Sequence, residues 1–308
     1  MTGSNPYWGV DFFEFLALFF SRVGRWMTGN LTTAELAADD VQVLVLSLIG
    51  ISSALIGSLL VLKKMTMLAN SLSHTILLGI VTAYVLGTHG ISLATLIIAA
   101  LVAAWMTTVL TQGLIHWMKL QEDASIGLVF TTLFALGVVL VTLLTRNAHI
   151  GTEAVMGNVD ALHVNDLKLA AAVAGFNIIV VLLFFKEFKL MAFDPAFAVT
   201  IGLSAALWNY VFMTMTALTA VAAFRAVGVL LVLALLVGPV LIARLYVKRL
   251  KALMAVSSVI GVGVSLVAVA LARHLLSVYD LPLSTAGIVV TLIGVLYMGL
   301  LLCKRSSF

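Results

Sequence analysis

The chain has 308 residues, of which 63% are hydrophobic and 10% are charged, and its mean hydropathy is +1.20. Soluble domains carry about 45–50% apolar and about 25% charged residues, so this composition excludes an ordinary water-soluble fold and indicates a protein that spans lipid. The net charge of +4 does not indicate nucleic-acid binding, because most of the 17 basic residues lie just outside apolar runs.

Residues 1–40 precede the first long apolar run. This segment lacks the early basic region of a secretory signal, and Asp11 and Glu14 interrupt its apolar stretch at residues 10–20. That stretch is shorter than the roughly 20 residues that a helix needs to cross a bilayer. We therefore expect an amphipathic helix in the membrane interface, with Trp8 and Trp26 near the headgroups, rather than an additional span.

Nine apolar runs of transmembrane length follow. They are Val41–Leu62, Met65–Leu86, Ile91–Ile115, Ala124–Thr145, Leu169–Phe185, Leu203–Ala223, Ala226–Tyr246, Ala252–Ala272 and Thr285–Cys303. The sequence thus predicts an all-α, polytopic transmembrane helical bundle over residues 41–303, with a short tail at residues 304–308. The single cysteine, Cys303, is expected as a free thiol in the last helix.

Basic residues predict the orientation of this bundle. The richer set of turns holds Lys63, Lys64, Lys119, Lys186, Lys189, Arg244, Lys248, Arg249, Lys251, Lys304 and Arg305. The alternate side holds Arg146, Lys168, Arg225 and Arg273, with Arg22 and Arg25 in the N-terminal segment. Because basic residues concentrate on the cytoplasmic side, we expect a cytoplasmic C-terminus and an external N-terminal segment.

Two longer polar stretches connect the predicted spans. The outer one, residues 146–168, contains His149, Glu153, Asp160, His163 and Asp166, which could form a vestibule that attracts cations. The inner one, residues 186–202, contains Asp194 followed by Pro195, a pair that favours the first turn of a short helix. That stretch is either a docking surface for a soluble partner or an ordinary re-entry turn.

Polar residues inside a span are costly in lipid and are therefore informative. Asn70 and His74, in the second predicted span, are four positions apart and project from one helical face. An imidazole nitrogen and an amide oxygen there could coordinate a divalent cation, or the two side chains could hydrogen-bond neighbouring helices. The other histidines lie in predicted loops or at helix ends, and the methionine pairs are typical of packing rather than of copper binding.

Other motifs narrow the function further. The sequence has no G-x-x-x-x-G-K-[ST] loop, no H-E-x-x-H and no G-x-S-x-G, so it predicts neither its own ATP site nor a familiar hydrolase.

Gly228, Gly238 and Pro239 fall within one predicted span. Pro239 removes a backbone donor and allows a kink, which is either static or part of a moving gate.

Five sequence blocks, in order over nearly the whole chain, resemble one family. They are 61–65 with 68–74 and 78–80 (VLKKM, LANSLSH, LGI), 122–130 (EDASIGLVF), 156–166 (MGNVDALHVND), 193–198 (FDPAFA), and 226–245, which runs from AVGVLLV through Pro239 to ARL. Together they are similar to the permeases of bacterial zinc, manganese and iron ABC importers, the metal-ion group called ABC-3. The family carries Asp and His in its second helix, where this chain has Asn70 and His74, so one carboxylate per subunit is lost.

The resemblance implies a permease subunit in the bacterial cytoplasmic membrane, with no permanently bound cofactor and a divalent metal ion as cargo. Two permeases, identical or paralogous, would form the path, cytoplasmic ATPase subunits would hydrolyse ATP, and an external metal-binding protein would deliver the ion. The ATPases would dock at Asp194 and Pro195 or at Arg244, Lys248 and Arg249. The binding protein would dock at Glu153, Asp160, His163 and Asp166.

Other functions remain open from sequence. An ion-gradient-driven secondary transporter is disfavoured because no Asp or Glu lies in mid-span. A membrane-embedded enzyme would need a nucleophile or a metal triad within the spans, where only one histidine is found. A permease for a larger metal chelate would need a wider path. The sequence identifies neither the metal nor a homodimer over a heterodimer.

Overall fold

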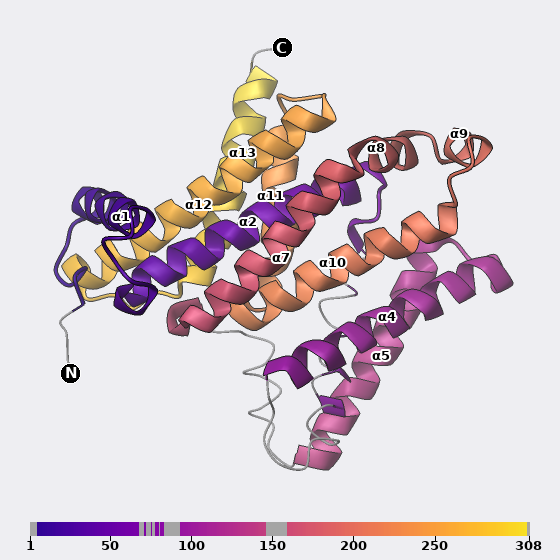
Figure 1. The fold of residues 1–308 in the computed structure, drawn as a ribbon, viewed down its shortest axis with the longest axis horizontal. Helices are drawn as coiled ribbons and strands as arrows, with labels where there is room; N and C mark the ends of the chain where they lie inside the picture. Colours follow the sequence, from indigo (N-terminus) through magenta and orange to yellow (C-terminus); the bar gives the residue numbers. More distant parts are fainter. Residues whose placement is uncertain are drawn as a thin grey trace.

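The computed structural model describes residues 5–67, 71, 75, 78–79, 81–82, 93–145 and 159–306. Every regular element in these residues is helical, as predicted, and they contain no strand (Figure 1). The α-helices are α1 (Phe12–Met27), α2 (Ala38–Leu62), α4 (Leu93–Met118), α5 (Glu122–Thr145), α7 (Val164–Leu183), α8 (Phe185–Phe193), α9 (Pro195–Thr200), α10 (Ala205–Val227), α11 (Val229–Arg244), α12 (Leu250–Tyr279) and α13 (Thr285–Ser306). Two short 3-10 helices are η1 (Thr33–Glu35) and η2 (Val159–Ala161).

Six helices of the described residues are long and apolar enough to cross a membrane. They are α2, α5, α7, α10, α12 and α13, while α4 and α11 contain the shorter apolar stretches Leu101–Ile115 and Leu231–Arg244. Each predicted span coincides with a helix except Met65–Leu86, most of which lies outside the described residues. The chain is therefore a multi-pass membrane protein, and the total of nine spans stays a prediction.

Several helix boundaries differ from the apolar runs by a few residues, and two of them have a visible cause in the backbone. α12 continues for two turns beyond the expected end at Ala272 and stops at Asp280, which has φ 54° and begins the turn before Pro282. α11 begins only at Val229, because Gly228 has φ 80°, a left-handed value that interrupts the helix. Apolar length therefore located the spans, whereas local backbone breaks set their ends.

α2 lies at the centre of the bundle, between α12 and α11 on one side and α7 on the other (Figure 1). Glycine lets its neighbours approach closely. A Cβ added to Gly57 would lie 1.8 Å from the carbonyl oxygen of Leu236 in α11, and one added to Gly50 would lie 3.3 Å from the carbonyl carbon of Gly261 in α12. Small residues at helix crossings are typical of membrane bundles, where close packing holds helices together.

α4 and α5 form a pair that joins the rest of the described bundle mainly through α10 (Figure 1). Their outward positions carry large exposed apolar side chains, among them Trp105, Leu128 and Val139. Such surface would be unfavourable in water and is expected on helices that face lipid or another membrane helix.

Candidate functional site

The predicted metal residues Asn70 and His74 lie outside the described residues, as do His149 and Glu153. Their neighbours Ser71 and Thr75 are described. Both residues are helical, and both side chains are buried. The hydroxyl of Ser71 is buried without a hydrogen-bond partner among the described residues. Its burial shows that this part of the second span faces protein on at least one side.

Leu78, a described residue of the predicted span Met65–Leu86, packs against α5. Leu78 forms a buried cluster with Val129 and Leu133, and a Cβ added to Gly137 would lie 3.3 Å from the backbone nitrogen of Leu78. No group of three or more His, Cys, Asp or Glu side chains that could hold a metal occurs in the part of the chain that the structure describes.

A polar cluster that the sequence analysis missed lies in the middle of the bundle. The amide nitrogen Nδ2 of Asn177 in α7 is 2.6 Å from the Ser52 hydroxyl in α2 and 2.6 Å from the Thr219 hydroxyl in α10. All three side chains are buried. The signal in the sequence was an asparagine in the centre of an apolar run, and hydrogen bonds of this kind join membrane helices.

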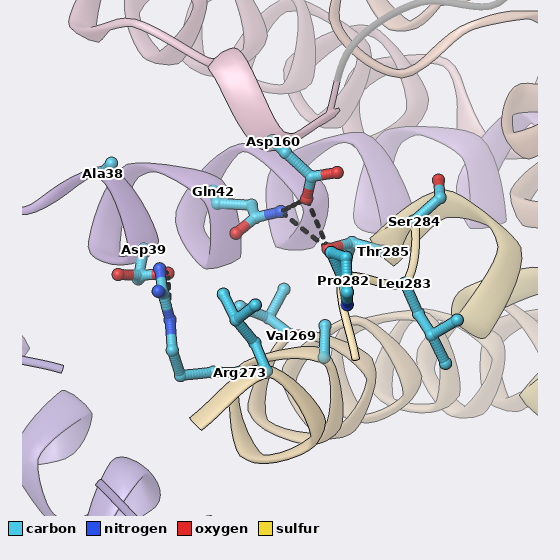
Figure 2. Close-up of a pocket in the computed structure, with 12 residues that line it drawn as sticks. Ala38, Asp39, Gln42, Asp160, Val269, Arg273, Pro282, Leu283, Ser284 and Thr285 are labelled. Atoms are coloured by element: carbon cyan, nitrogen blue, oxygen red, sulfur yellow. Dashed lines mark hydrogen bonds and ion pairs between the residues drawn. The ribbon is translucent and has the colours of Figure 1, made fainter. Parts of the chain in front are cut away.

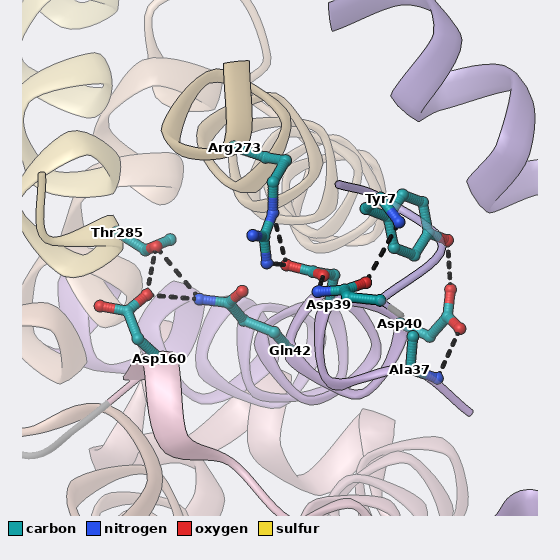
Figure 3. Close-up of polar contacts among 9 residues, drawn as sticks. Tyr7, Ala37, Asp39, Asp40, Gln42, Asp160, Arg273 and Thr285 are labelled. Atoms are coloured by element: carbon teal, nitrogen blue, oxygen red, sulfur yellow. Dashed lines mark hydrogen bonds and ion pairs between the residues drawn. The ribbon is translucent and has the colours of Figure 1, made fainter. Parts of the chain in front are cut away.

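A second polar network lies at the end of the bundle where α2 begins and α12 ends (Figure 3). Nε of Arg273 donates to Oδ1 of Asp39 at 3.1 Å, and Nη2 donates to the same oxygen. Beside this pair, Nε2 of Gln42 donates to Oδ1 of Asp160 at 2.9 Å, and the Thr285 hydroxyl donates to that oxygen at 2.6 Å. The network thereby joins α2, η2, α12 and the start of α13.

These side chains line a half-open cavity of about 440 Å³ (Figure 2). Asp39, Gln42, Asp160 and Arg273 supply its polar wall. Its apolar wall consists of Val269, Leu276, Pro282 and Leu283 together with the small side chains of Ala38 and Ala272. Arg273 compensates the charge of Asp39, and the second carboxylate of the polar wall, Asp160, accepts hydrogen bonds from Gln42 and Thr285.

Three of the predicted binding-protein contacts are described. Asp160 lies in η2, His163 is the N-cap of α7, and Asp166 follows three residues later. Oδ2 of Asp166 accepts a hydrogen bond from the His163 backbone nitrogen at 3.0 Å, so this carboxylate stabilises the start of α7. Asp160 and His163 are exposed, whereas Asp166 is buried.

The predicted gate residues are all described. Gly228 separates α10 from α11, and Pro239 lies inside α11. A Cβ added to Gly238 would lie 2.3 Å from Cγ2 of Ile293 in α13. Gly228 thus breaks the helix just before α11, Pro239 removes a backbone donor within α11, and Gly238 lets α13 approach α11 closely.

The predicted ATPase-docking residues lie at α9 and in the turn between α11 and α12, at the opposite end of the bundle from the start of α2 (Figure 1). Oδ1 of Asp194 accepts from the Phe197 backbone nitrogen at 3.0 Å, and Pro195 occupies the first turn of α9. The expectation of a short capped helix is thus confirmed. Arg244 ends α11, and Lys248 and Arg249 are exposed in the following turn.

The apolar helical bundle, joined by buried polar clusters, is that of a polytopic membrane protein. Comparison with known sequences identifies the family to which it belongs. The model of the ABC 3 transport family matches residues 41–304, and the chain belongs to this family.

Several relatives align with most of this chain. A probable metal transport system membrane protein of Chlamydia muridarum is 44% identical over 304 residues, covering 96% of this chain and 94% of that protein. The manganese transport system membrane protein MntD of Bacillus subtilis is 38% identical over 227 residues, covering 70% of this chain and 76% of MntD. A chelated iron transport system membrane protein, YfeD of Yersinia pestis, is 33% identical over 226 residues, covering 73% of this chain and 74% of YfeD.

The fold is also found in solved structures. A chain of PsaBC from Streptococcus pneumoniae, solved with an antibody fragment, aligns with a TM-score of 0.72 at 20% identity and covers 90% of this chain and 94% of that chain. An inward-facing putative metal-chelate type ABC transporter aligns with a TM-score of 0.65 at 17% identity, covering 85% of each chain.

Proposed function

We propose that this chain is the membrane-spanning permease of an ATP-binding-cassette importer that carries a divalent transition-metal ion into the cytoplasm. The observation that carries the proposal is the family match over residues 41–304, together with relatives named for manganese and iron transport at 38% and 33% identity. The chain has no nucleotide-binding motif of its own, so ATP would be hydrolysed by a partner subunit.

In this proposal His74 is the residue that meets the cargo ion, with Asn70 as an oxygen ligand beside it. A neutral imidazole and an amide bind a divalent ion more weakly than a carboxylate cage, which suits a site that must release its ion. A second copy or a paralogue would place a matching residue across the path. ATP binding and hydrolysis would then switch which side of the path is open.

The two ends of the bundle have different proposed partners. We assign the end with Asp39 and Arg273 to the outside, where a metal-binding protein would meet Glu153, Asp160, His163 and Asp166. The other end would be cytoplasmic and would meet the ATPase through α9 or through the turn at residues 244–249. The exposed side chains of Phe193 and Phe197 flank the Asp194 cap and give α9 an apolar contact surface.

The Gly228 break and Pro239 would let α11 change its bend as the path opens. A helix that lacks one backbone hydrogen bond bends at lower cost than a regular one. The crossing of Gly238 with Ile293 would couple such a bend to α13.

The test is reconstitution of the chain in vesicles with its candidate ATPase and binding protein, followed by ion uptake across a panel of Mn²⁺, Zn²⁺ and Fe²⁺. The proposal expects uptake of at least one ion that requires ATP and stops with a hydrolysis-deficient ATPase. Uptake by the chain alone, driven by an ion gradient, would instead identify a secondary transporter.

A metal chelate is the second candidate cargo, because YfeD is named for chelated iron and one similar structure is described as metal-chelate type. Adding each ion both free and as a chelate separates these cargoes. Uptake of the chelate alone would favour the second candidate.

A further inference from the structure

The N-terminal helix α1 has three distinct faces. One face is buried against the bundle: Phe15 is fully buried, Phe19 is 6% exposed, and Phe12, Leu16 and Val23 pack against the same core. A second face is polar and exposed, and carries Asp11, Glu14, Ser21 and Arg25. The third face is apolar and exposed.

This third face consists of Phe13, Ala17, Phe20, Gly24 and Met27. Their spacing of four and three residues places them on one stripe of a helix. Phe13 is 80% exposed, Phe20 is 62% exposed and Met27 is 79% exposed. A stripe of large apolar side chains that no other described part of the chain covers needs a non-aqueous neighbour.

The segment is fixed to the outermost turn of α2 by buried polar contacts (Figure 3). The Tyr7 hydroxyl donates to Oδ1 of Asp40, and Nε of Arg22 donates to Oδ2 of Asp40 at 2.8 Å. Nδ2 of Asn5 donates to Oδ2 of Asp39 at 2.7 Å. Arg22 lies in α1 itself, so α1 cannot turn its exposed apolar face inward without breaking the ion pair with the buried Asp40.

α1 lies at the end of the bundle where α2 begins and α12 ends (Figure 1). α1 contains 16 residues, or about 24 Å of helix, which is less than the roughly 30 Å of a hydrocarbon core. It lies beside the end of α12, where Nδ1 of His274 is 3.7 Å from Oδ1 of Asp11 and the His274 ring is 6.1 Å from the Tyr279 ring. The side chains of Trp8 and Tyr279, 77% and 63% exposed, are of the type that gathers at the lipid headgroups.

We propose that α1 lies in the lipid–water interface as a membrane anchor, and that its Phe13–Phe20–Met27 stripe is covered by lipid. The three faces then meet three surroundings: the bundle, water and the acyl-chain boundary. Residues 5–40 precede the part of the chain that the family model matches. The anchor holds the start of α2 and the end of α12 at a fixed depth in the membrane, whichever ion is carried.

The test uses the full chain with Cys303→Ser, which removes the single cysteine, reconstituted in phospholipid vesicles. New cysteines at Ala17→Cys or Gly24→Cys report on the stripe, and Ser21→Cys on the polar face of the same helix is the matched control. Each is labelled with a nitroxide, and its collision rates with lipid-soluble oxygen and with a water-soluble nickel chelate are measured. Gly24 has open space around its Cα, so the label fits there without displacing neighbours.

The proposal expects the ratio of oxygen to nickel collisions to be high at positions 17 and 24 and low at position 21, at a depth of about 5–10 Å below the headgroups. Equal nickel access at positions 17, 21 and 24 would overturn it, because the stripe would then face water. Shielding from both reagents would also overturn it and would indicate a covering protein. A depth near the bilayer centre would instead indicate a span.

Discussion

Asp39 and Arg273, separated by 234 positions in the sequence, form an ion pair that joins the first turn of α2 to the last turns of α12. The Asp39 side chain is 4% exposed and the Arg273 side chain is 16% exposed. Pairs of this kind contribute little net stability as a unit, but removing one partner leaves a buried charge uncompensated.

The first prediction follows from this asymmetry. Arg273→Gln leaves the Asp39 carboxylate buried and should lower the free energy of unfolding by about 3 kcal/mol. The double variant Asp39→Asn with Arg273→Gln should recover most of that loss. Thermal unfolding in detergent measures both, with the exposed Arg249→Gln as the control, and equal losses in the single and double variants would contradict the account.

The α2–α11 crossing gives a second prediction. Gly57→Ala places a methyl group against the backbone carbonyl of Leu236, which no side-chain rotation can relieve, and should cost about 3 kcal/mol. The control is Gly113→Ala in α4, whose added Cβ meets nothing within 4 Å and which should be neutral or stabilising by up to about 1 kcal/mol. A Gly57→Ala variant as stable as the control would show that α2 and α11 are not packed this closely.

Asn177 provides a third prediction, on the polar cluster in mid-bundle. Asn177→Ala removes the two hydrogen bonds to Ser52 and Thr219 and should destabilise the protein by about 1 kcal/mol. The matched control is Asn165→Ala, on an exposed position of the same helix. If the two substitutions lower the unfolding midpoint equally, the buried amide contributes nothing specific.

Tyr7 gives a prediction on pH. Burial, together with the hydrogen bond to Asp40, raises the pKa of the Tyr7 hydroxyl far above its usual range. Since the pKa is higher in the folded state, the stability that Tyr7 contributes is fully present below about pH 10 and is lost only as pH rises further. Tyrosine ionisation followed by ultraviolet absorbance should thus give superimposable curves for the folded wild type and Tyr7→Phe between about pH 9 and pH 11. If the wild type instead shows one more ionising tyrosine than Tyr7→Phe in this pH range, the result would contradict a buried Tyr7 hydroxyl.

Much of the fold was predictable because lipid imposes a simple rule. Runs such as Val41–Leu62 and Thr285–Cys303 became helices at nearly the expected residues, since each backbone group in a span must bond within its own helix. The Asp194 cap was also predictable, because a cap depends on neighbours in sequence.

The partners of polar residues were not predictable in the same way. Asp160 was expected in an outer docking loop, yet its carboxylate accepts hydrogen bonds from Gln42 and Thr285, which are distant in sequence. Only the helix arrangement brings these three together. Likewise, Gly228 was noted as a gate residue, but its positive φ, which ends α10, is a property of the folded backbone.

The cargo site itself rests on sequence. Asn70 and His74 share one predicted helical face and lie outside the described residues, whereas their neighbours Ser71 and Thr75 are helical and buried. Their contact with an ion stays a prediction that requires a transport measurement.

The most direct measurement is ATP-driven metal uptake by vesicles containing wild type or His74→Ala, assembled with the same ATPase and binding protein, with ATP hydrolysis recorded in parallel. The control is His89→Ala, at a histidine that the sequence places in a loop. The account predicts that His74→Ala loses uptake while ATP hydrolysis continues, and that His89→Ala transports normally. Unchanged uptake by His74→Ala would contradict it.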